Sequence, residues 1–188
     1  MAAASKAALQ RLANDVRSEL DLDGQSPFDF DRWSEEYSIP IISAAEVGAS
    51  EAAVAHVTRL ASHLWSAGLL QNGTGHIIVF NPAHSRVRVR SNLAHEVAHI
   101  IAEHVLGTTW LDEDGGCTGA GKVQEQEAAE LAGALLIPPE AAKRAAMYGR
   151  APETIARQFD VSVEMAEWRM RMSGGAVIAK RWRARSGR

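Results

Sequence analysis

The sequence has little cysteine, little net charge and no long apolar run. Its 188 residues include a single cysteine, Cys117, which excludes an internal disulfide and favours a reducing compartment such as the cytoplasm. Twenty Lys and Arg against 23 Asp and Glu give a net charge of −3, so direct binding to nucleic acid is not expected. No stretch approaches the roughly 18 apolar residues of a membrane span, and early charges leave no apolar core for a signal peptide.

The hydrophobic pattern predicts an α+β protein that is mostly helical. Hydrophobic residues make up 46% of the chain and charged residues 23%, which is ordinary for a globular protein and argues against disorder. Spacings of three and four between apolar residues predict helices at about 2–20, 28–37, 50–70, 92–106, 122–136, 139–147, 151–158 and 162–172. Short apolar runs predict a small mixed or antiparallel sheet, with strands at 38–42 and 76–80 and a further candidate at 86–90.

These elements suggest four segments along the chain. Residues 1–26 are expected to form an N-terminal helix, and residues 27–140 the main domain. Short helices in 141–175 are expected to pack on that domain, and the basic residues of 176–188 to form a flexible tail.

The strongest motif is His95-Glu96-Val97-Ala98-His99, inside the helix predicted to follow residue 91. At about 100° per residue the two histidines lie one turn apart on the same face, so both imidazoles can bind one ion. Glu96 points elsewhere, and is placed to take a proton from a water molecule at that ion. Because buried histidines without a metal need other partners, the motif predicts a zinc site with His95 and His99 as ligands and Glu96 as the catalytic base.

A third ligand has to come from another part of the chain. His104 lies about 140° around the helix from His99, so it is expected to be solvated or to support a ligand indirectly. The helix at 122–136 carries three glutamates, and Glu127 lies nearest its apolar face, with Glu125 further away and Glu130 furthest. Glu127 is therefore the favoured ligand, and Glu125 stays open as the alternative.

These motifs, in this order, resemble the ImmA/IrrE family of metallo-endopeptidases. The resemblance covers about residues 30–140 and rests on the histidine motif followed by Glu125-Gln126-Glu127-Ala128 and the apolar stretch that ends at Pro138. It implies a zincin-like domain of the gluzincin type, with His95, His99 and Glu127 as Zn²⁺ ligands and Glu96 as the general base. It also implies helix-turn-helix transcriptional repressors as substrates, in stress response or mobile-element regulation, and, by analogy of fold, an extended substrate that joins the edge of the sheet around residues 76–80.

Other features receive a simpler interpretation. The sequence from Gly116 to Lys122 imitates a phosphate-binding loop, but Val123 stands where that loop needs Ser or Thr. The 156–168 region resembles part of a helix-turn-helix, although Met165, Trp168 and Met172 are more simply a core face. An alternative function is a regulatory protein that sequesters a repressor or contacts DNA without significant turnover.

Overall fold

The computed structural model describes residues 3–73, 75–104 and 121–185. Its contacts divide the chain into two units, one formed by Met1–Ala4 with Asp29–Ala132 and the other by Ser5–Phe28 with Gly133–Arg188. Most of the predicted glycine-rich loop, including Cys117, lies outside the described residues. The four predicted segments stay a prediction. No helix in the described part of the chain is both long and apolar enough to cross a membrane.

The first unit contains a mixed sheet of three strands in the order β1-β3-β2. Strand β1 (Ile41–Ser43) runs parallel to β3 (Gly75–Phe80), and β2 (Ala67–Asn72) pairs antiparallel with β3. Gly73, with φ of 61°, lies in the turn between β2 and β3, where a positive φ favours glycine. The central strand is therefore β3, which was predicted as the best strand, and the sheet has β1 and β2 as its edges.

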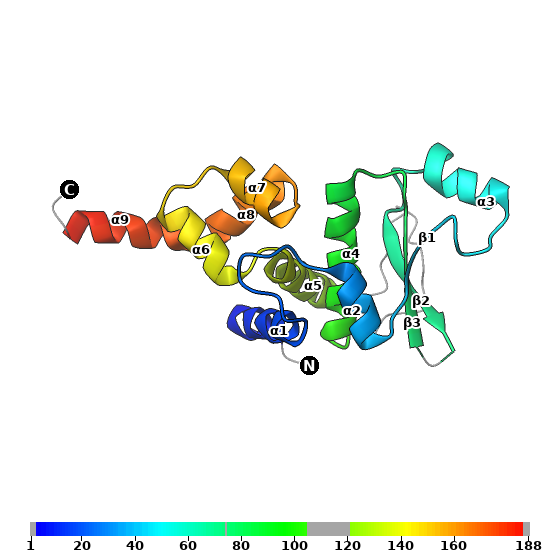
Figure 1. Cartoon of the computed structure of the whole chain (residues 1–188), viewed down its shortest axis with the longest axis horizontal. Coiled ribbons are helices and arrows are strands. Elements are labelled where there is room, and N and C mark those ends of the chain that lie inside the picture. Colours follow the sequence, from blue (N-terminus) through cyan, green and yellow to red (C-terminus); the bar gives the residue numbers. More distant parts are fainter. Residues whose placement is uncertain (1–2, 74, 105–120, 186–188) are drawn as a thin grey trace. The chain divides into compact units, whose positions relative to one another are not determined.

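Helices cover this sheet and hold the functional motifs. Helix α2 (Phe30–Tyr37) contacts β1, and α4 (Arg86–Ile101) packs on β2 and β3 (Figure 1). Helix α5 (Lys122–Leu136) contributes its first eleven residues to the same unit. The fully buried side chains of this unit include residues from α2, β3, α4 and α5, namely Trp33, Ile78, Val97, Ala98, Ala128 and Leu131. The structure thus confirms the predicted α+β class.

The second unit is helical. It contains α1 (Lys6–Glu19), the end of α5, α6 (Pro139–Met147), α7 (Pro152–Phe159), α8 (Val163–Met172) and α9 (Gly175–Arg185). Helix α6 packs against α8 and α9, and α7 packs against α8. The buried face of α8 is Ala166, Arg169 and Met170, whereas the predicted core face included Met172, which is 46% exposed.

The long helix predicted over 50–70 is wrong. The chain forms α3 (Glu51–Ala55), continues as a π-helical turn, η1 (His56–Leu60), and then becomes the edge strand β2. Leu60 and Leu64, which would share one face of such a helix, are 76% and 53% exposed. The backbone of residues 67–72 forms its hydrogen bonds with β3 instead of within a helix. The spacing of apolar residues along the chain does not show that such a partner strand is present.

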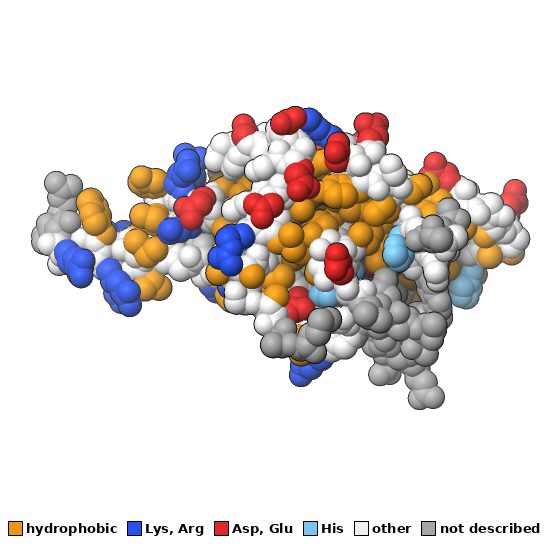
Figure 2. Space-filling view, turned by 90° about the horizontal axis from the view of Figure 1, so that it is seen from below, with side chains coloured by type: hydrophobic (Ala, Val, Ile, Leu, Met, Phe, Trp, Pro, Cys, Tyr) orange, Lys and Arg blue, Asp and Glu red, His pale blue; other side chains and the backbone are white. Residues whose placement is uncertain are grey.

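A further prediction about local structure is wrong. Residues 86–90 are the first turns of α4, which begins after Ser85, and do not form a strand. The basic tail at 176–188 stays a prediction, and its residues up to Arg185 belong to α9. Helix α9 buries Gly175 and Ala179 but exposes Val177, Ile178 and Trp182, and Figure 2 shows hydrophobic and basic side chains side by side at this end of the molecule.

Candidate metal site

Helix α4 presents His95 and His99 on one face, as their spacing predicted. The Nε2 atoms of the two imidazoles lie 3.1 Å apart, and their rings meet edge to face. The side chain of His99 is 4% exposed and that of His95 is 32% exposed. The pair is therefore closed toward the core at His99 and open to solvent at His95.

Glu125, in the first turn of α5, completes the cluster. Its Oε2 atom lies 3.1 Å from Nε2 of His95, and its Oε1 atom lies 3.4 Å from Nε2 of His99. One ligand atom from each of the three residues lies within 4.8 Å of the others, the arrangement expected of residues that share an ion. The structure therefore brings together the two predicted histidines and the alternative glutamate.

The separations between these donor atoms fit a tetrahedral zinc site. With ligand bonds of about 2.0–2.1 Å, a tetrahedral ion holds its ligand atoms about 3.3 Å apart. The two Nε2 atoms lie 3.1 Å apart, close to that value. The carboxylate of Glu125 approaches them through different oxygens, Oε2 at 3.1 Å from His95 and Oε1 at 3.4 Å from His99. The two Nε2 atoms and the carboxylate oxygens converge, so a cation placed between them would attract all three groups. Two imidazoles and one carboxylate also leave a fourth position open, as catalytic zinc sites do.

The surroundings set the protonation of the site. Burial, with smaller contributions from His95 and His104, lowers the pKa of His99 to about 3, so this imidazole is neutral and its lone pair is available to a metal. Burial, together with the negative charge of Glu125, raises the pKa of half-buried Glu96 to about 7. A bound dication would act in the opposite direction on Glu96. A carboxyl group that titrates near neutral pH suits a general base.

Glu127, the glutamate favoured by the sequence, does not join this cluster. Its Oε2 atom lies 3.2 Å from Nε2 of His104, and its Oε1 atom accepts a hydrogen bond from the backbone N–H of Ala4. The side chain of Glu127 is 15% exposed, against 38% for Glu125. Closeness to the apolar face of α5 correctly identified the more buried carboxylate, but the site opens to solvent and contains the more exposed one.

The family assignment follows from a match to a family model. Residues 51–171 match the peptidase M78 model, which is described as an IrrE N-terminal-like domain. The chain belongs to the peptidase M78 family. The match confirms the family suggested by the sequence motifs, and it includes all of α4 and α5. A comparison with curated proteins gave no significant match.

Membership of the M78 family indicates a metallopeptidase, and the cluster on α4 and α5 is compatible with a metal. His95, His99 and Glu125 lie in the same unit as Glu96, whose pKa is raised in part by the charge of Glu125. The position of His104, which lies next to this cluster, differs most from the one predicted from the sequence. Its side chain is 4% exposed and contacts Nδ1 of His99, where solvent exposure had been one of two expectations.

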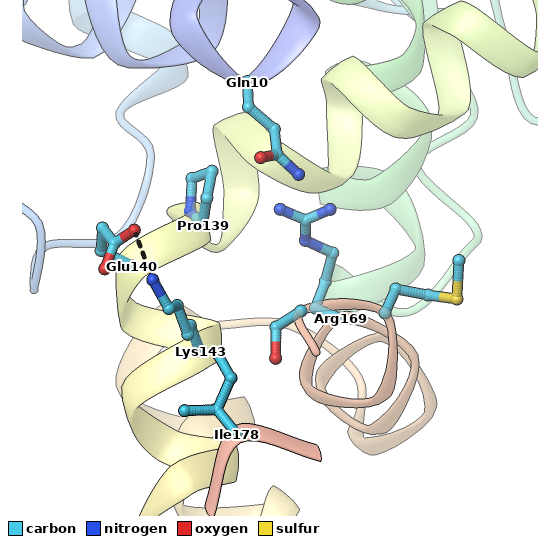
Figure 3. Close-up of a pocket in the computed structure, with 8 residues that line it drawn as sticks. Gln10, Pro139, Glu140, Lys143, Arg169 and Ile178 are labelled. Carbon is cyan, nitrogen blue, oxygen red and sulfur yellow. Dashed lines mark ion pairs between the residues drawn. The ribbon is translucent and has the colours of Figure 1, made fainter. Parts of the chain in front are cut away.

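A cavity of about 280 Å³ in the second unit of this M78 protein is separate from the cluster in its lining residues (Figure 3). Gln10 and Arg169 extend into it, and an ion pair of 3.5 Å joins Glu140 to Lys143 at its edge. None of the four residues proposed for metal binding and catalysis lines it. The cavity therefore belongs to the helical unit and takes no part in the metal site.

Proposed function

We propose that this protein is a zinc-dependent endopeptidase in which His95, His99 and Glu125 hold the ion. The observation that carries the proposal is the convergence of two imidazole nitrogens and one carboxylate at separations that suit a tetrahedral ion. Support for the reaction class comes from the M78 match. Zinc is the ion that a neutral pair of histidines with one carboxylate favours in hydrolytic enzymes.

Each residue has a defined task in this proposal. A bound zinc ion would polarise the scissile carbonyl and increase the acidity of the attacking water. Glu96 accepts the proton of that water and passes it to the nitrogen of the leaving amine, the task of a general acid–base carboxylate. The two imidazoles serve as metal ligands and do not exchange protons with the substrate.

The substrate is proposed to be a protein segment in extended conformation. Strand β1 covers one side of β3 only from Ile78 to Phe80, so the predicted pairing of substrate with residues 76–80 is restricted to the start of that strand. Strand β2 is an edge and contacts α4, the helix that carries both histidines. Its outer backbone groups can pair with an extended chain beside the metal site.

The family resemblance, rather than the geometry, supports a helix-turn-helix repressor as the substrate. It also supports a role in stress response or mobile-element regulation, in the cytoplasm.

The proposal is tested by Glu96→Gln. An amide has nearly the same shape as the carboxyl group but cannot act as a base, so cleavage of a helix-turn-helix repressor that the wild-type protein cleaves should fall at least about 100-fold. Zinc content, measured by mass spectrometry, should stay at about one ion per chain. The matched control is Glu51→Gln, because Glu51 is an exposed carboxylate in the same unit.

Three results would count against parts of the proposal. Wild-type protein without zinc overturns the metal site, and full cleavage by Glu96→Gln places the base elsewhere. If zinc binds and the repressor is bound but never cleaved, a sequestering protein replaces the peptidase.

A further inference from the structure

A chain of hydrogen-bonding groups runs from the rear of the metal cluster into the protein. Nδ1 of His99, the nitrogen that points away from the cluster, lies 3.0 Å from Nδ1 of His104. Nε2 of His104 lies 3.2 Å from Oε2 of Glu127. Both outer side chains are largely buried, at 4% and 15% exposure. His99 is thus connected on one side to the proposed metal ligands and on the other to a buried histidine and carboxylate.

The end of α4 brings His104 to this position. After Ala102 caps the helix, Glu103 takes a left-handed conformation with φ of 51°. The backbone N–H of Glu103 then donates to the carbonyl of Ile100, and that of His104 donates to the carbonyl of His99, each at 3.0 Å. These two bonds form a Schellman motif, which folds the chain back over the last turn. Because the chain turns back after the helix, His104 does not lie at the helical angle of about 140° from His99 that the sequence prediction assumed.

The chemistry of the groups allows one consistent arrangement of protons. If Nε2 of His99 keeps its lone pair for a metal, its hydrogen is on Nδ1, which donates to Nδ1 of His104. His104 then carries its own hydrogen on Nε2 and donates to the carboxylate of Glu127. Every donor meets an acceptor in this arrangement. The carboxylate at the end of the chain accepts only, and so determines the direction of both bonds.

We propose that His104 and Glu127 are positioning residues for the metal site, because together they hold His99 in the tautomer and orientation that present Nε2 to the ion. This inference rests on the proposed function. Hydrogen bonds of this kind to the second nitrogen of a ligating histidine make it a better ligand, and losing them costs about 10–100-fold in metal affinity. It also gives Glu127 a task at the site, although Glu127 is not a ligand.

A double-mutant cycle on the full-length protein tests the inference. Zinc affinity is measured by competition with a chromophoric chelator for His104→Leu, for Glu127→Leu and for the variant with both substitutions. Each single substitution should weaken zinc binding by about 10-fold or more. The double variant should lose no more than the worse single variant, because both residues act through the same bond to His99. Unfolding of the metal-free proteins is measured alongside, to separate affinity from stability.

A pair of conservative variants at position 104 adds a sharper distinction. The side-chain oxygen of asparagine can occupy the position of Nδ1 and accept from His99, whereas glutamine can reach Glu127 but offers no acceptor at that position. His104→Asn should therefore recover most of the zinc affinity lost in His104→Leu, and His104→Gln should not. A purely structural role predicts the reverse pattern, with stability changed in the metal-free protein and zinc affinity unchanged.

The possible failures are distinguishable. Wild-type protein that takes up no zinc overturns the proposed function and this inference together. Wild-type protein that binds zinc, with unchanged affinity in all variants, overturns this inference alone. Losses that multiply in the double variant would show that His104 and Glu127 act independently, which also contradicts it.

Discussion

At the scale of single residues, two glutamates two positions apart on α5 have different partners. Glu125 contacts the Nε2 atoms of His95 and His99, whereas Glu127 contacts His104. Both residues lie in the first turns of α5. Their partners differ because the two side chains leave the helix in different directions. A direct bond to the metal should contribute more to the metal affinity than a hydrogen bond that acts through another side chain.

Glu125→Ala should therefore weaken zinc binding more than Glu127→Ala does. We expect a loss of at least about 100-fold for Glu125→Ala, which removes a ligand, and about 10-fold for Glu127→Ala, which removes an indirect contact. Glu130→Ala, on the same helix, serves as the control and should stay within a few fold. Competition titrations of the three variants give the order. If Glu127→Ala had the larger effect, the ligand assignment would return to Glu127.

Arg17 offers a second prediction at this scale. Its guanidinium is 3% exposed and donates to the carbonyl oxygens of Leu135, Asp23 and Ser26 at 2.8, 2.7 and 2.6 Å. Arg17→Met removes the donors to all three carbonyls and should lower the free energy of unfolding by about 2–4 kcal/mol. Urea unfolding measures the change. Arg11→Met, at an exposed position of the same helix, should change it by less than about 0.5 kcal/mol.

At the scale of elements, the contact between α5 and α8 depends on one glycine. A Cβ atom at Gly133 would lie 2.5 Å from Cζ3 of Trp168 and 2.9 Å from Cδ of Arg169. Real side chains do not approach so closely. The two helices can therefore pack as they do only because residue 133 has no side chain. Within this unit, helix packing thus depends on a residue that is itself unfavourable inside a helix.

Gly133→Ala should accordingly destabilise the protein in spite of the better helix propensity of alanine. Overpacking costs about 1–3 kcal/mol and the propensity returns about 1 kcal/mol, so a net loss of up to about 2 kcal/mol is expected. The control is Gly24→Ala, where no heavy atom lies within 4 Å of the new Cβ atom. Thermal unfolding of both variants decides the matter. Equal melting temperatures for the two variants would contradict the packing argument.

At the scale of the whole molecule, the metal site joins two helices that are separated in sequence. His95 and His99 come from α4, Glu125 comes from α5, and all three belong to the first unit. An unfolded chain does not hold these donors together. Binding of a metal at this candidate site would therefore stabilise the folded state by mass action.

Removal of the metal should lower the melting temperature. At free zinc about 100 times the dissociation constant, binding contributes about 2.7 kcal/mol, which corresponds to roughly 5–10 °C for a chain of this length. A melting curve with and without a chelator measures the shift. His95→Ala removes a half-exposed ligand, and its melting temperature should no longer respond to the chelator. A zinc-loaded wild type that is insensitive to the chelator would contradict the proposed link between metal and stability.

Local patterns predicted the parts of the fold that depend on near neighbours. The helix at Lys122–Leu136, the strand at Gly75–Phe80 and the pairing of His95 with His99 follow from spacing within a few residues. The helix predicted over 50–70 failed because a strand partner outside the window satisfies β2. The strand predicted at 86–90 is also wrong. Alternating Arg and Val suit a strand, but these residues continue directly into the helix α4.

The sequence by itself determined the chemistry of the site, because the two histidines and Glu96 are related by the geometry of one helix. Only the tertiary structure decided which glutamate meets them. That choice depends on how α4 and α5 face each other, and Glu125 and Glu127 are separated by too small a step along the helix for apolar periodicity to distinguish them. The place of His104 was also a tertiary result, because the left-handed backbone at Glu103 ends the helix and turns the next side chain toward His99.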